Sequence, residues 1–95
     1  MTVVEQFITD WLNFDTKLRS KEGIDYDLLE KIETALTKIK EEFQESAVIP
    51  KGLAGIFIDM YSAIESTSYL YADEQQKEII SIAETFAYLA RDICS

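Results

Sequence analysis

Hydrophobic residues recur at intervals of three and four along four stretches of the chain, which is the spacing that places them on one face of an α-helix. The four faces contain Val4, Phe7, Ile8, Trp11, Phe14 and Leu18; Leu28 or Leu29, Ile32, Ala35, Leu36, Ile39 and Phe43; Leu53, Ile56, Phe57, Met60, Tyr61 and Ile64; and Ile79, Ile82, Ala83, Phe86, Leu89, Ala90 and Ile93. The pattern predicts four amphipathic helices over approximately residues 3–20, 26–45, 50–66 and 73–93.

Residues that stop or start helices separate the first three stretches. Gly23 is suited to the C-terminal end of the first helix, and Asp25 or Asp27 can cap the second. Pro50 disfavours helix at the preceding residue and suits the first turn of the third helix.

The third break contains two tyrosines, Tyr69 and Tyr71, that lie outside the hydrophobic faces. Asp73 follows them and is expected to be the N-cap of the fourth helix, with Gln76 at the N3 position of a capping box. Tyrosines with one polar end are common at recognition surfaces, but they also close the ends of helical bundles. Both interpretations of the two tyrosines are open at this point.

Helices joined by connections of several residues favour an antiparallel up-down-up-down four-helix bundle, an all-α fold. A chain of 95 residues accommodates one such domain, residues 1–95. Only three glycines and one proline argue against an all-β protein, which needs frequent turns. Trp11 could anchor an interface, but its position between Phe7 and Phe14 places it in the core.

Charge and composition exclude several classes of function. The net charge of −9, from 18 acidic and nine basic residues, disfavours binding to nucleic acid because like charges repel phosphate. There is no histidine, the commonest general base and metal ligand. Cys94 is the only cysteine, so the chain forms no internal disulfide, which fits a reducing cytoplasmic location. We also expect a monomer.

No arrangement of residues in the sequence points to catalysis. Pairs of carboxylates, such as Asp25 with Asp27, are typical of solvated helix starts, and no motif for a metal or a phosphate accompanies them. We therefore expect no enzyme activity, no catalytic residue, no metal and no cofactor. The N-terminus lacks the pattern of a signal peptide and no window is apolar enough to span a bilayer, which leaves only peripheral contact with a membrane.

The second half of the chain, "IPKGLAGIFIDMYSAIESTSYLYADEQQKEIISIAETF", resembles the immunity proteins of pediocin-like (class IIa) bacteriocins, the enterocin A immunity family. The similarity covers roughly residues 48 to 90 and follows a family pattern at Pro50, Leu53, Tyr61, Gln75 and the pair Ile79–Ile80. Members of that family are small cytoplasmic four-helix bundles.

The resemblance implies a protein that protects its producer from a bacteriocin without chemistry, and thus confers resistance to an antimicrobial peptide. Its expected partner is the mannose phosphotransferase permease that serves as the bacteriocin receptor, with or without the bacteriocin itself. The family places specificity in the C-terminal half, which implies contacts from Tyr69, Tyr71, Asp73 and the exposed side of the last helix, including Arg91.

Two other classes of protein compete with this interpretation. An acidic helical adaptor or inhibitor, similar to an antitoxin, would mask a basic partner and would present a contiguous acidic face. A small helical enzyme of the chorismate mutase type would need arginines in the core, whereas Arg19 and Arg91 lie near helix ends. A mixed surface with an aromatic end would favour the immunity interpretation over the inhibitor.

Overall fold

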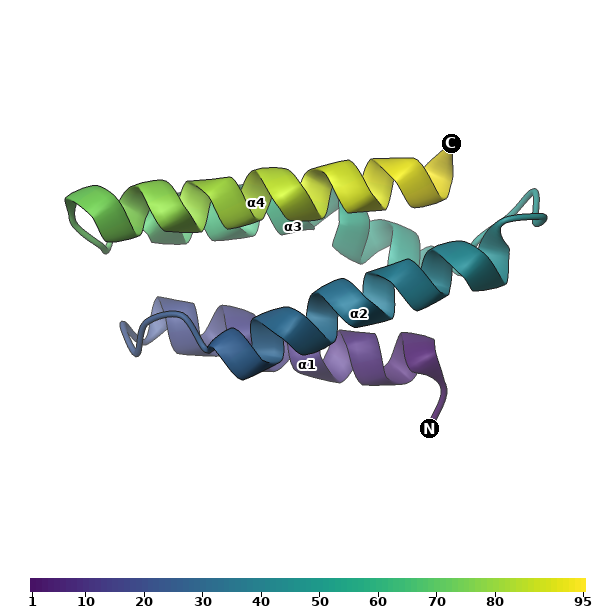
Figure 1. Cartoon of the computed structure of the whole chain (residues 1–95), viewed down its shortest axis with the longest axis horizontal. Helices are drawn as coiled ribbons and strands as arrows, with labels where there is room; N and C mark the ends of the chain where they lie inside the picture. The colour runs from purple at the N-terminus through teal and green to yellow at the C-terminus, as the bar shows by residue number, and fades with distance from the viewer.

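The computed structural model describes residues 1–95 and consists of four helices: α1 (Val3–Arg19), α2 (Tyr26–Phe43), α3 (Lys51–Ser68) and α4 (Asp73–Cys94). Successive helices run in opposite directions along a molecule of 41 × 25 × 19 Å (Figure 1). The predicted all-α, up-down-up-down four-helix bundle is confirmed. The predicted bounds agree with these helices to within two residues.

The bundle is assembled from two helical hairpins, α1 with α2 and α3 with α4. The hairpins pack so that α1 lies beside α3 and α2 lies beside α4, which leaves α2 and α3 on one diagonal of the bundle (Figure 1). The connection 44–50 therefore crosses between diagonal helices at one end. Both the α1–α2 turn and the α3–α4 turn lie at the opposite end (Figure 1).

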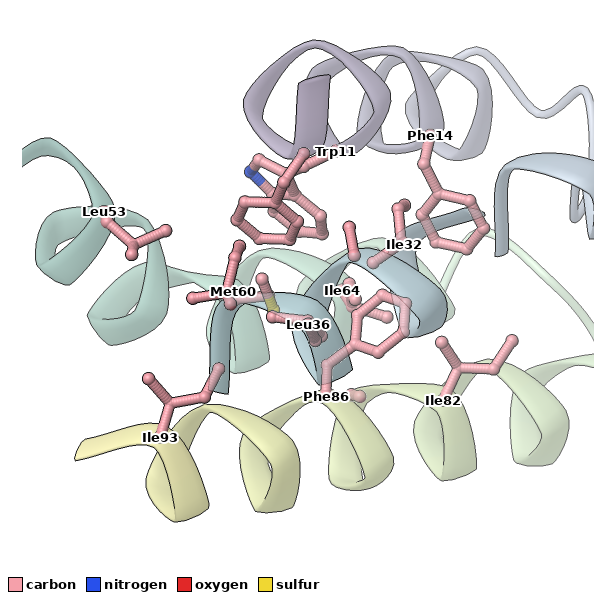
Figure 2. Close-up of a cluster of buried hydrophobic side chains, with 14 of the residues drawn as sticks. Trp11, Phe14, Ile32, Leu36, Leu53, Met60, Ile64, Ile82, Phe86 and Ile93 are labelled. Atoms are coloured by element: carbon pink, nitrogen blue, oxygen red, sulfur yellow. The ribbon is translucent and has the colours of Figure 1, made fainter. Parts of the chain in front are cut away.

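The core is formed by the four predicted hydrophobic faces, whose members are all buried or half-buried. Trp11 is 5% exposed, so its prediction as a core residue is confirmed. The ring of Phe86 from α4 meets Trp11 and Phe14 of α1 across the diagonal, with ring centroids 6.5 and 5.9 Å apart (Figure 2). Such tilted aromatic pairs stabilise a core beyond the area that they bury.

Side chains cap the first two helices. Thr2 and Glu5 form a capping box at α1, in which each side chain bonds to the other residue's backbone N–H. Asp25 is the N-cap of α2 and accepts a hydrogen bond from the Leu28 N–H at 3.0 Å, as predicted. Pro50 occupies the N-cap position of α3, one residue before the helix begins.

The predicted cap of α4 is wrong. Ala72 is the N-cap, and the Asp73 side chain makes no capping hydrogen bond. An N-cap residue needs extended backbone angles, which Ala72 has at φ −98° and ψ 150°, whereas Asp73 has φ +40°. The backbone conformation thus moves the cap one residue earlier, to a side chain that cannot accept a hydrogen bond, and no capping box with Gln76 forms.

The end of α1 also differs from the prediction. Lys21, with φ +61°, takes the left-handed position after the helix, and the N–H groups of Lys21 and Glu22 bond to the carbonyls of Leu18 and Lys17. These two bonds define a Schellman motif. Gly23, expected to stop the helix, instead provides a second left-handed residue, at φ +90°, further along the turn.

Candidate functional site

The α3–α4 turn, residues 69–72, is closed by backbone hydrogen bonds from Leu70 to Thr67 and from Tyr71 to Ser68, each 3.0 Å long. Thr67 and Ser68 are polar residues buried at the end of α3. Their hydroxyls donate to carbonyls of the preceding helical turn, at 2.8 and 2.6 Å, which removes the cost of burying them. The end of α3 is therefore a satisfied and well-packed support for the turn.

Tyr71 ties this turn to the turn between α1 and α2. Its half-buried hydroxyl donates to the Leu18 carbonyl at 2.8 Å and accepts from the Gly23 N–H at 3.0 Å. Leu18 and Gly23 lie about 50 residues away along the chain, so this contact exists only in the folded bundle. The geometry gives Tyr71 a structural role, closing the end of the bundle.

Tyr69 and Leu70 have the opposite environment on the same turn. Tyr69 is 69% exposed and its hydroxyl makes no hydrogen bond within the chain, and Leu70 is 46% exposed. An aromatic and an aliphatic side chain are thus both exposed on a turn that Tyr71 holds in place. We refer to Tyr69 and Leu70 as the turn patch.

Asp73 begins α4 next to the turn patch and is exposed. Arg91 is also exposed, but it lies 18 residues further along α4, about 27 Å away at the rise of an α-helix. The structure therefore brings Tyr69, Tyr71 and Asp73 to one end of the bundle and separates Arg91 from them. The four residues do not form one site.

Arg91 instead borders a shallow apolar groove of about 410 Å³ between α3 and α4, beside Ile58, Ala87 and Cys94. Ile58 is 78% exposed, although a bulky aliphatic residue is usually buried. Ile58 is not among the functional residues predicted from the sequence. Ile58 is missing from the predicted hydrophobic face of α3. That absence indicates an exposed side chain, because a large apolar residue outside the buried face points to solvent.

Two polar contacts join α2 to α4. Lys40 pairs with Asp92 at 2.7 Å, and the Tyr26 hydroxyl donates to Glu78 at 2.8 Å. The hydrogen bond to Asp92 raises the pKa of Lys40, and the hydrogen bond to Glu78 raises the pKa of Tyr26. Neither pair could be predicted from the sequence, because each depends on α2 and α4 being neighbours.

The structure contains no cluster of metal ligands and no membrane-spanning helix. No group of three or more acidic or cysteine side chains is arranged to hold a metal ion. None of the four helices combines the length and apolar character required to cross a membrane. The chain matches no protein-family model, no curated protein and no solved structure.

Proposed function

We propose that this protein is an immunity protein that protects a cell from a pediocin-like bacteriocin. It acts by non-catalytic contact with the bacteriocin's receptor complex at the cytoplasmic face of the membrane. The turn patch carries the proposal, because Tyr69 and Leu70 are exposed on a turn that hydrogen bonds hold in place. A preorganised aromatic anchor binds a partner with little loss of conformational entropy.

No bond needs to be made or broken for such protection. A rigid bundle that binds one state of a receptor assembly better than another shifts the assembly toward that state. The two hairpins are joined at the turn end by Tyr71, so the turn patch is presented by a folded bundle and not by a loose loop. This rigidity supports a role in recognition.

The distribution of charge favours this function over an acidic inhibitor. Four basic side chains form ion pairs with acids on the surface: Lys17 with Asp25, Arg19 with Asp15, Lys40 with Asp92 and Lys77 with Glu74. An inhibitor that masks a basic partner would gain from a contiguous acidic face. The mixed surface with an exposed tyrosine at one end fits the immunity function better.

The function is tested by producing the chain in a bacteriocin-sensitive strain and measuring the concentration of each of several pediocin-like peptides that kills half the cells. For at least one peptide, we expect the concentration that kills half the cells to be about tenfold higher than in cells with an empty vector. A tenfold change corresponds to a modest interaction of about 1.4 kcal/mol. Unchanged killing by every peptide, with soluble protein present in the cells, would contradict the function.

The turn patch is tested in the same strain with Tyr69→Ala. We expect most of the protection to be lost while the free energy of unfolding changes by less than about 0.5 kcal/mol, as is usual for an exposed site. Leu12→Ala is the matched control, because Leu12 is an exposed apolar residue (54%) on α1, in the other hairpin. Equal protection by both variants would remove the turn patch from the contact surface.

A further inference from the structure

The α3–α4 hairpin forms one side of the bundle and carries the shallow apolar groove of about 410 Å³ that Arg91 borders (Figure 1). We refer to it as the α3–α4 groove. Three small side chains line it, those of Ala54, Ala87 and Ala90. Ile58 lines the same groove and is 78% exposed. One face of the molecule therefore combines a hollow lined by alanines with a bulky aliphatic side chain of the kind that could fill such a hollow.

Two charges without a partner lie on the adjoining surface of α4. Glu84 and Arg91 are exposed, and neither takes part in an ion pair in the structure. They are seven residues apart, close to two turns of an α-helix, so their side chains lie on the same side of α4. Ala87 lies between them along the helix. This surface therefore carries a negative and a positive charge on either side of a small residue.

Such an arrangement is complementary to a second copy of α4 that runs in the opposite direction. If a two-fold axis passes between Ala87 and Tyr88, Glu84 and Arg91 are equally far from the axis along the helix. Each Arg91 then faces Glu84 of the other copy, because a two-fold axis repeats every contact. Ile58 lines the groove together with Ala87, so the two Ile58 side chains meet near the same axis. The small Ala87 side chain lets the helices approach closely.

We propose that the protein forms a symmetric dimer through the α3–α4 groove, with Ile58 at the centre and two Arg91–Glu84 ion pairs beside it. A second copy fits this face because the face supplies both members of each contact. The dimer is weak, because one hairpin face is a small interface and the net charge of −9 on each copy opposes association. It replaces the monomer expected from the sequence. The proposal is independent of the immunity function, since it uses neither Tyr69 nor Leu70.

The apolar contact is tested by sedimentation equilibrium at about 150 mM salt, which screens charges more than about 8 Å apart. Reducing conditions keep the exposed Cys94 from forming a disulfide. We expect the mass to rise from monomer to dimer between about 5 and 500 μM protein, as for a weak interface. Ile58→Ser should weaken the dimer about tenfold or more, because each dimer loses two buried isoleucines. Leu12→Ser is the matched control on α1, where Leu12 is 54% exposed, and should leave association unchanged.

The ion pairs are tested by exchanging the charges. Arg91→Glu sets two carboxylates against each other on both sides of the axis and should weaken the dimer about tenfold or more. Lys38→Glu is its control, because Lys38 is exposed on α2 without an ion pair and the net charge changes equally. Adding Glu84→Arg to Arg91→Glu should restore association, since the pairs are re-formed with their charges reversed. Circular dichroism verifies that each variant is folded.

A monomer over the whole concentration range would overturn the proposal. Equal association of Ile58→Ser and Leu12→Ser would place any interface elsewhere, with the same consequence. Species larger than a dimer would indicate open head-to-tail contacts and overturn the two-fold arrangement. If the double variant associates no better than Arg91→Glu alone, the antiparallel pairing of α4 is wrong. Should Ile58→Ser not fold, recovery in the double variant decides by itself, because a loss of folding cannot produce it.

Discussion

At the scale of single residues, Tyr69 and Tyr71 are two positions apart and have opposite environments. The sequence places both in the gap between two helices and leaves open whether they recognise a partner or close the bundle. In the structure the Tyr71 hydroxyl is used twice, by Leu18 and Gly23, whereas the Tyr69 hydroxyl faces solvent. The distinction depends on where the α1–α2 turn lies in space.

Tyr71→Phe keeps the ring and removes the hydroxyl, which leaves the Leu18 carbonyl and the Gly23 N–H without that partner. With about 0.5–1.5 kcal/mol for each hydrogen bond, we expect the free energy of unfolding to fall by about 1–3 kcal/mol. Urea denaturation followed by circular dichroism measures it. Tyr69→Phe is the control and should lie within about 0.5 kcal/mol of the unmodified protein. Equal effects of the two variants would contradict the structural role of Tyr71.

At the scale of elements, the helices are built from strong local signals, with one exception. Gly52 and Gly55 lie in the first turns of α3, where glycine lowers helix stability. A Cβ atom added at either position would meet no other atom within 4 Å, so close packing does not explain these glycines. The two glycines therefore lower the stability of the first turns of α3 without any gain in packing.

Gly55→Ala should stabilise the protein by about 0.5–1 kcal/mol, because alanine loses less backbone entropy in a helix and finds free space here. In a domain of this size that is a rise in Tm of several degrees, on the order of 4–8 °C per kcal/mol. Thermal unfolding followed by circular dichroism measures the shift. Gly23→Ala is the informative counterpart. Gly23 has φ +90°, which alanine adopts only with strain, so its Tm should fall. A lower Tm for Gly55→Ala would show that Gly55 has a function in α3 that its surroundings do not reveal.

At the scale of the whole molecule, the dependence of stability on pH comes in part from an ion pair that joins the ends of two consecutive helices. Lys17 near the end of α1 pairs with Asp25, the cap of α2, at 2.6 Å. The hydrogen bond from Lys17 is the main cause that lowers the pKa of Asp25, and the same bond raises the pKa of Lys17. The contribution of this ion pair to the stability of the α1–α2 hairpin therefore depends on pH.

The lowered pKa of Asp25 means that its contribution to stability is present above the ordinary value of 3.8 and is lost as the pH falls through the folded value. The raised pKa of Lys17 keeps its contribution up to the ordinary value of 10.5, beyond which it is lost as the pH rises through the folded value. Lys17→Gln should therefore lower the Tm slightly near neutral pH, and the difference should disappear in strong acid.

Thermal unfolding of both proteins between pH 2 and pH 8 measures this difference. Lys51→Gln is the control, since Lys51 is exposed and has no ion pair, and its small effect should not follow the titration of Asp25. A difference for Lys17→Gln that is constant across this range would show that the pair does not contribute through its charges.

The sequence by itself determined the four helices, their hydrophobic faces and a cap of α2 at Asp25 or Asp27, because these depend on contacts between residues a few positions apart. It also contained a signal that was missed, the capping box of Thr2 with Glu5. The cap of α4 was misplaced because a backbone angle at Asp73 overrides its side-chain preference.

Only the tertiary structure decided which helices are neighbours, and with that which residues share a site. In the structure Arg91 lies far from the turn patch, the Tyr71 hydroxyl bonds to the α1–α2 turn and closes the bundle, and Tyr69 is exposed. The structure also places Arg91 beside Ile58 at the α3–α4 groove. Helical periodicity specifies which face of each helix is buried, but the order of helices around the core is set by packing between residues far apart in the chain.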